Sequence, residues 1–313
     1  LTGMKYIGLD SQIRSNNFRS VILLILFPLV ILGLVWLFIF LVQPDSVPRL
    51  DMANQMFLRS IPWVLVGVAT WFVIAWFSHT TMIEKATGSV PLARKENKRV
   101  YNLVENLCIG SGMPMPKINV INDNSLNAFA SGINKPTFTV SLSRGIIDKL
   151  DDAELEAVIA HELTHIRNRD VRLLIVSIIF VGIFSFITEA LVRTTRFSGG
   201  SNRKDGRAVI IALLLAAVGY FLSSVFRFAI SRQREYMADA GSATMTKNPL
   251  ALASALEKIS ADPTIEAVRR NDVAQMFIDN PEPKKERPVS FSFGSIFMTH
   301  PPIEKRISLL RQF

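Results

Sequence analysis

The sequence predicts an integral membrane protein that is mainly helical, with α+β character in its soluble part. Hydrophobic residues make up 49% of the 313 residues, and the mean hydropathy of +0.30 is high for a soluble protein. This excess gathers in four apolar blocks, and the polar segments around them show helix-like or strand-like periodicity. The blocks are residues 21–42, 61–77, 171–192 and 208–230.

The first apolar block is long enough to cross a bilayer, because a helix needs about 20 residues to span a hydrocarbon core of about 30 Å. The second block reaches that length when it is extended to Ser60 and Ser78. The first block exceeds the apolar core of a cleavable signal peptide, about 7–15 residues, and no small-x-small cleavage site follows it. We therefore expect it to remain as an anchor, and residues 1–80 to form an N-terminal transmembrane hairpin.

Positive charge predicts the orientation of this hairpin. The formal net charge is +9, and the basic residues cluster at the ends of the apolar blocks, without the continuous basic stripe that binds nucleic acid. Arg14 and Arg19 precede the first block, the connection to the second block is nearly charge-balanced, and several lysines and arginines follow the second block. The positive-inside rule then predicts that the N-terminus and the chain after Thr80 face the cytoplasm.

Residues 81–170 are expected to form the first half of a soluble α+β domain. Apolar residues from Val100 to Cys108 recur at helical spacing, and Gly110 is the expected end of that helix. The stretches PKINVIND, residues 116–123, and PTFTVSLS, residues 136–143, alternate apolar and polar residues as short strands do. Turn-forming residues are frequent between them.

A helix that begins at residue 151 or 152 carries the most specific motif of the chain. Asp151 and Glu154 have the spacing of a capping box, with Asp in place of the usual Ser or Thr. His161, Glu162 and His165 fall on the face next to the apolar stripe of this helix. Two histidines one turn apart can bind one zinc ion, and Glu162 then points at the water in the open coordination position, as a general base for peptide-bond hydrolysis.

Catalytic zinc needs a third protein ligand. The metzincin continuation is absent, because Asn168 and Val171 replace its glycine and histidine. The segment SRQREYMADA offers Glu235 as a ligand, and Asp239, one helical turn later, is placed to accept a hydrogen bond from a ligating imidazole. A solvated acidic helix face is the alternative interpretation. A hairpin of the third and fourth blocks favours the ligand, because it returns this segment to the side where His165 lies.

The third and fourth apolar blocks are expected to form a second hydrophobic hairpin, residues 171–230. Their connection is basic, with Asp205 as its only acidic residue, so partial insertion is the alternative. The apolar surface of both blocks is large and needs an apolar environment, which favours a membrane-spanning hairpin. Residues 231–313 form the second half of the soluble domain. Within them, Asn248 with Pro249 opens one helix, the prolines 301 and 302 open another, and residues 280–288 form a surface loop.

Four sequence motifs, in their order along the chain, resemble those of the HtpX-type membrane zinc metallopeptidases, which are relatives of the CAAX prenyl proteases. They are AFASG, HELTHIRNRD, REYMADA and THPPIEKRI, at residues 128–132, 161–170, 234–240 and 299–307. The resemblance covers nearly the whole chain. It implies a multi-pass protease of the bacterial inner membrane, active in quality control and stress response. It also implies a cytoplasmic zincin-like (gluzincin) catalytic domain that holds one Zn²⁺ per chain.

The resemblance also implies roles for individual residues. His161, His165 and Glu235 bind the zinc ion, with Glu162 as the catalytic base. An edge strand pairs with the substrate backbone, and such a strand can bind any extended peptide. Its residues are Asn127, Ala128, Phe129 and Ala130.

Two further residues of the last motif each have two interpretations. His300 either donates a hydrogen bond to the oxyanion of the reaction or has a structural role as a cap of the helix at Pro301, and we prefer the structural role. Arg306 is either the partner of an active-site carboxylate or a solvated helix residue.

Two other functions compete with an endopeptidase that degrades misfolded membrane proteins. Processing of prenylated C-termini, as in the CAAX branch, predicts a large enclosed chamber in the membrane, and four spans offer little material for one. A membrane scaffold with a structural metal predicts a closed, cysteine-rich ligand set, which is absent here. The expected partners are therefore unfolded or membrane-protein substrates and the lipid bilayer, with no nucleic acid.

Overall fold

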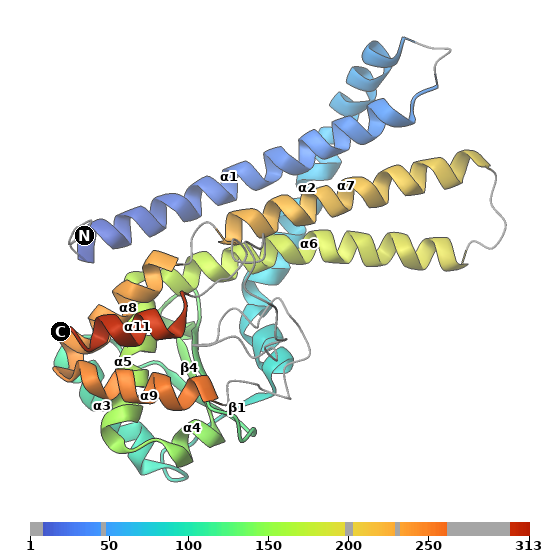
Figure 1. Cartoon of the computed structure of the whole chain (residues 1–313). Helices are drawn as coiled ribbons and strands as arrows, with labels where there is room; N and C mark the ends of the chain where they lie inside the picture. The colour runs from blue at the N-terminus through green and yellow to red at the C-terminus, as the bar shows by residue number, and fades with distance from the viewer. Residues whose placement is uncertain (1–8, 45–47, 198–202, 229–231, 262–300) are drawn as a thin grey trace. The chain divides into compact units, whose positions relative to one another are not determined.

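The computed structural model describes residues 9–44, 48–197, 203–228, 232–261 and 301–313 (Figure 1). These residues are mainly helical and include one small sheet. They divide into two compact units. The first draws on Leu1–Phe18, His79–Ile175 and Phe228–Phe313, and the second on Arg19–Ser78 and Val176–Arg227. His300 and the loop predicted at residues 280–288 lie outside the described residues.

Four long helices contain the first three apolar blocks and the described part of the fourth, residues 208–228. They are α1 (Leu9–Val42), α2 (Arg49–Thr87), α6 (Asp170–Phe197) and α7 (Arg203–Phe228). In the described part of the chain, two segments are long and apolar enough to cross a membrane, Arg14–Val42 and Arg49–Thr87. Within α7, the apolar stretch Val209–Leu222 is shorter. The second transmembrane hairpin therefore stays a prediction.

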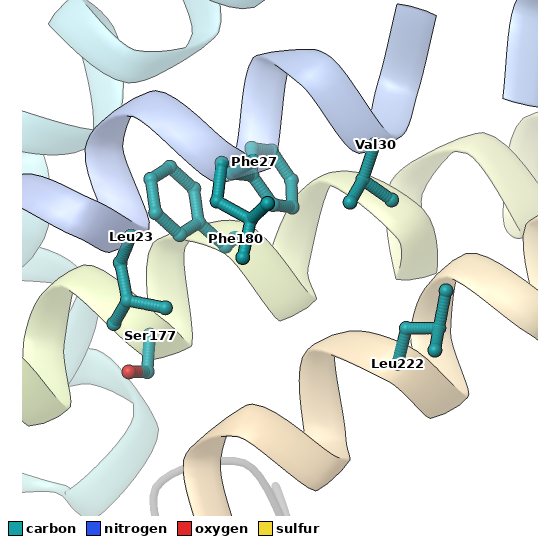
Figure 2. Close-up of a pocket in the computed structure, with 7 residues that line it drawn as sticks. Leu23, Phe27, Val30, Ser177, Phe180 and Leu222 are labelled. Atoms are coloured by element: carbon teal, nitrogen blue, oxygen red, sulfur yellow. The ribbon is translucent and has the colours of Figure 1, made fainter. Parts of the chain in front are cut away.

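Aromatic side chains join the helices of the second unit. Phe27 of α1 stacks on Phe180 of α6, with ring centroids 3.9 Å apart and an interplanar angle of 11°. Trp71 of α2 donates its indole N–H to the carbonyl of Ile179 in α6, at 3.1 Å. Figure 2 shows an apolar pocket among α1, α6 and α7, lined by Leu23, Phe27, Val30, Ser177, Phe180 and Leu222.

The sheet of the first unit has four strands, in the order β1-β2-β4-β3. They are β1 (Ser89–Pro91), β2 (Lys117–Ile121), β3 (Ala128–Ser131) and β4 (Thr139–Ser143). β2 runs parallel to β4, whereas β1 and β3 are antiparallel to their neighbours. The two predicted strands are confirmed as β2 and β4. β3 lies in the turn-rich stretch between them, at one edge of the sheet.

Helix α3 (Lys98–Ser111) continues past the glycine that the sequence analysis took as its end. Asn97 caps its N-terminus by accepting a hydrogen bond from the backbone N–H of Val100, at 3.0 Å. Gly110 remains helical, and Gly112 adopts the left-handed conformation, with φ of 65°. The prediction that the helix ends at Gly110 was wrong. The glycine that takes the left-handed conformation typical of helix ends is Gly112, two residues later.

Helix α5 (Asp152–Asn168) is the central element of the first unit, and most of its residues are buried. The predicted capping box is confirmed. Asp151 accepts from the N–H of Glu154 at 2.8 Å, and Glu154 accepts from the N–H of Asp151 at 3.0 Å. α5 packs against α3, β3, β4 and two later helices, α8 (Arg232–Thr246) and α9 (Pro249–Ala261).

The last described helix, α11 (Ile303–Leu310), packs on α8 and α9. Its start after the prolines 301 and 302 confirms the sequence prediction. The predicted start of α9 is also confirmed, because Asn248 accepts a hydrogen bond from the N–H of Ala251 at 3.2 Å and Pro249 is the first helical residue. The short helix α4 (Arg144–Lys149) follows β4.

A glycine lets α8 lie close to α5. A Cβ atom at Gly241 would come 2.4 Å from Cγ2 of Thr164, so only a residue without a side chain fits at this point. The next residue, Ser242, donates its hydroxyl to the carbonyl of Ala157 at 2.6 Å. The absence of a side chain at Gly241 and the hydrogen bond of Ser242 let α8 pack closely on α5. Glu235 lies in the first turn of α8, so this packing also places Glu235.

Candidate metal centre

Two histidines of α5 and one glutamate of α8 converge on a single point. The Nε2 atoms of His161 and His165 are 3.2 Å apart, and each lies 3.6 Å from an oxygen of Glu235. Ligand atoms on a tetrahedral zinc ion, each about 2.0–2.1 Å from the metal, are about 3.3 Å apart. The donor types and their separations therefore fit one zinc ion. Within the described residues, these three form the one group of donors close enough to hold a metal ion.

Glu162, between the two histidines, is 2% exposed. Burial raises the pKa of its carboxyl group, while the charges of both histidines and a hydrogen bond from the backbone of Ala130 act in the opposite direction. A raised pKa brings a carboxylate closer to the range in which it takes up and returns a proton at neutral pH. Glu162 therefore has the properties of a general base.

The strand β3 contributes the backbone of Ala130 to this site and lies at the sheet edge. Its one neighbour in the sheet is β4, with Phe129 opposite Ser141 and Ala130 opposite Val140. Asn127, just before the strand, is buried, as are Ala128, Phe129 and Ala130. The segment predicted to pair with substrate is therefore an edge strand in contact with Glu162.

Asp239 lies beside His161. Its Oδ1 atom is 3.0 Å from Nδ1 of His161, and a carboxylate at this nitrogen favours the tautomer whose Nε2 is free to bind a metal. Although burial by itself raises the pKa of Asp239, the charge of Arg306 and the hydrogen bonds of His161 and Arg306 hold it below its ordinary value. Arg306 is 1% exposed, so its interpretation as a solvated helix residue is wrong.

The carboxylates of Asp239 and Glu235 affect the pKa of His161. Burial lowers the pKa of this imidazole, but the neighbouring carboxylates of Asp239 and Glu235 outweigh burial and raise the pKa to about 9. A proton and a metal ion compete for the same nitrogen lone pair. The occupancy of the site by metal therefore depends on pH.

Asp170 also lies in the site, a position that was not predicted from the sequence. Its Oδ2 atom lies 3.2 Å from Nδ1 of His165. In a continuous helix, a residue five positions later would point about 140° away around the axis. Here α5 ends because Arg169 takes the left-handed conformation, with φ of 59°, and α6 begins at Asp170. The only signal in the sequence is that Asp170 closes the motif HELTHIRNRD.

Two histidines one helical turn apart, a glutamate donor from a second helix and an adjacent buried carboxyl group are the arrangement of the metallopeptidase class. Two helices of the same chain are long and apolar enough to cross a membrane. Comparison with protein families is consistent with this class, because residues 94–313 match the family described as Peptidase family M48.

The relatives are proteases described as HtpX homologues. One from Bacteroides fragilis is 57% identical and covers 99% of this chain and 100% of its own length. One from Dictyoglomus thermophilum is 39% identical, over 79% of this chain and 81% of that protein. Among solved structures, the crystal structure of S. mikatae Ste24p is similar with a TM-score of 0.43 and 18% identity, over 89% of this chain and 61% of that chain. The chain belongs to peptidase family M48 and is a membrane-bound metallopeptidase, as the four motifs predicted.

Proposed function

We propose that this protein is an HtpX-like zinc endopeptidase that degrades misfolded or damaged membrane proteins in quality control and stress response. The observation that carries the proposal is the convergence of His161, His165 and Glu235, with donor separations of 3.2–3.6 Å, beside the buried carboxyl group of Glu162. Structural zinc sites are usually closed by four protein ligands, whereas three ligands leave a position open for chemistry.

Each residue of the site has a defined task in peptide hydrolysis. His161, His165 and Glu235 hold one Zn²⁺ per chain, and Asp239 orients the imidazole of His161. A metal ion held there would polarise the substrate carbonyl and lower the pKa of a water molecule to about 7. Glu162 would take the proton of the attacking water and return it to the leaving amine nitrogen.

The edge strand β3 selects the form of the substrate. The backbone of residues 127–130 pairs with an extended peptide through main-chain hydrogen bonds, which do not depend on the side chains of the substrate. The hydrogen bond between Ala130 and Glu162 keeps this strand next to the base. An enzyme of this kind accepts many sequences but requires an unfolded segment, which suits misfolded proteins as substrates.

The four-part organisation of the chain follows from the same proposal. Residues 1–80 and 171–230 form membrane hairpins, and residues 81–170 and 231–313 form the two halves of a gluzincin catalytic domain. The basic residues around the apolar blocks orient this domain toward the cytoplasm, at the inner membrane. The partners are the lipid bilayer and unfolded or membrane-protein substrates, with no nucleic acid.

Cleavage of an unfolded model protein by the full chain, purified in detergent and loaded with zinc, tests the proposal. We expect Glu162→Gln to lower kcat by about 10²–10⁴-fold while zinc content stays at the wild-type level. Glu156→Gln, a change of the same kind six residues earlier on α5, is the matched control and should cleave normally. Cleavage by Glu162→Gln at the wild-type rate would show that the proposed mechanism is wrong.

A further inference from the structure

Each histidine of the candidate metal centre has a carboxylate at its Nδ1 atom, and each carboxylate is held by a residue from a distant part of the chain. Asp239, beside His161, accepts hydrogen bonds from Arg306 of α11. Asp170, beside His165, accepts one from Asn16, which lies near the start of the chain in α1. The proposed function gives no role to Asp170 or Asn16.

The contacts of Asp170 use both oxygens of its carboxylate. Oδ2 faces Nδ1 of His165 at 3.2 Å, and Oδ1 accepts a hydrogen bond from Nδ2 of Asn16 at 2.5 Å. The backbone carbonyl of Asp170 accepts a hydrogen bond from Arg234 at 3.2 Å. Asp170 and Asn16 are each 1% exposed. A buried carboxylate needs such partners, because its loss of hydration is otherwise uncompensated.

An asparagine suits this position because its amide nitrogen carries two N–H donors. Nδ2 of Asn16 donates to Asp170 and also, at 2.9 Å, to the carbonyl oxygen of Asn168. That carbonyl is one of the last in α5, where helical carbonyls lack partners within the helix. Asn16 therefore ties the end of the metal-binding helix and the carboxylate of Asp170 to the same point.

We propose that Asp170 and Asn16 are positioning residues of the metal centre. Asp170 accepts the N–H of Nδ1 of His165 and so directs Nε2 of that imidazole to the metal, and Asn16 fixes the orientation of Asp170. Asn16 is the third residue of the apolar segment Arg14–Val42, so the first membrane helix takes part in building the metal site. This inference rests on the proposed function, because it requires His165 to be a ligand.

Zinc affinity of the full chain in detergent, measured by competition with a chromophoric chelator, tests the inference. We expect Asp170→Ala to weaken zinc binding by about 10–100-fold, and Asn16→Ala by a smaller factor of about 3–10. The double variant should bind zinc as Asp170→Ala does, within about twofold, because Asn16 acts through Asp170. Asn17→Ala, at the adjacent position of α1, is the matched control and should bind zinc as the wild type does.

A spectroscopic readout separates positioning from general loss of structure. The visible absorption bands of the Co²⁺-loaded protein report ligand geometry, and we expect them to change in Asp170→Ala and Asn16→Ala but not in Asn17→Ala. Asp170→Asn keeps the shape of the side chain and one acceptor oxygen. If Asp170→Ala does not fold, Asp170→Asn should fold, bind zinc with intermediate affinity and show a smaller spectral change.

The outcomes distinguish this inference from the function on which it rests. Wild-type zinc affinity in both Asp170 variants, or losses that add in the double variant, would overturn the inference while the zinc peptidase stands. Cleavage by Glu162→Gln at the wild-type rate would overturn the proposed mechanism alone. A wild-type protein that binds no zinc would overturn both.

Discussion

The guanidinium group of Arg306 holds the carboxylate of Asp239 through two parallel hydrogen bonds, from Nε at 2.9 Å and from Nη2 at 2.7 Å. Both residues are buried. Paired bonds of this kind are geometrically specific as well as strong, because the planar fork of arginine matches the two oxygens of a carboxylate. Through Asp239, the C-terminal helix α11 therefore determines the orientation of His161.

Removal of Arg306 should destabilise the protein. Arg306→Ala removes one of the two cationic neighbours of the buried Asp239 carboxylate, the other being His161, and breaking a buried pair costs about 3–5 kcal/mol. Arg306→Lys keeps a charge but loses the paired geometry, so we expect an intermediate loss. Thermal unfolding of the metal-free protein measures both. Lys305→Ala, at the exposed neighbouring position of α11, is the control, and an unfolding temperature of Arg306→Ala equal to the wild type would contradict the prediction.

The helices and the candidate metal donors on α5 were predictable because their signals are local. The capping box of Asp151 and Glu154, the spacing of His161 and His165, and the proline start of α9 depend on a few neighbouring residues. The residues of each such pattern are neighbours both in the sequence and in the structure. The third donor, Glu235, required an argument about chain direction as well.

The residues that orient the donors were harder to predict because their contacts join distant parts of the chain. Asp170 meets His165 only because Arg169 takes a left-handed conformation that most residues avoid. The contact of Asn16 with Asp170 joins residues 154 positions apart. The burial of Arg306 follows from the packing of α11 on α8 and α9, and an arginine within the apolar face of a helix does not by itself show which carboxylate it contacts.

The close packing of α5 and α8 predicts that Gly241 does not tolerate a side chain. In Gly241→Ala, the new Cβ would lie 2.4 Å from Cγ2 and 2.6 Å from Oγ1 of Thr164, so α8 must move away and take Glu235 with it. We expect a stability loss of about 1–3 kcal/mol and weaker zinc binding. Gly110→Ala is the matched control, because nothing lies within 4 Å of a Cβ there. That change should stabilise α3 by about 0.5–1 kcal/mol.

An ion pair at the start of α5 predicts a pH-dependent stability. Burial raises the pKa of Glu154, but hydrogen bonds from Lys258, Ser254 and the backbone of Asp151 outweigh burial and hold the pKa below its ordinary value. A lowered pKa in the folded state stabilises the protein above the unfolded pKa, about 4.3, and this stabilisation is lost as the pH falls through the folded pKa.

Glu154→Gln should therefore unfold at a lower temperature than the wild type above about pH 5, by an amount corresponding to about 1–2 kcal/mol. The two unfolding temperatures should converge as the pH falls below about 4. Thermal unfolding measured from pH 3 to pH 8 checks this, with Glu156→Gln as the control on the same helix. A difference that stays constant over this range would show that the charge of Glu154 is not responsible.

The raised pKa of His161 predicts that zinc binding releases a proton. With a pKa of about 9, the metal-free imidazole is protonated at pH 8, and zinc binds only the neutral form. Zinc affinity should therefore rise with pH and level off above about pH 9. Calorimetry at pH 8 in buffers with different ionisation enthalpies should detect about one proton released from His161 per zinc ion. Asp239→Asn removes the carboxylate that raises this pKa, so its proton release should be smaller. Equal release in the variant and the wild type would contradict the assigned role of Asp239.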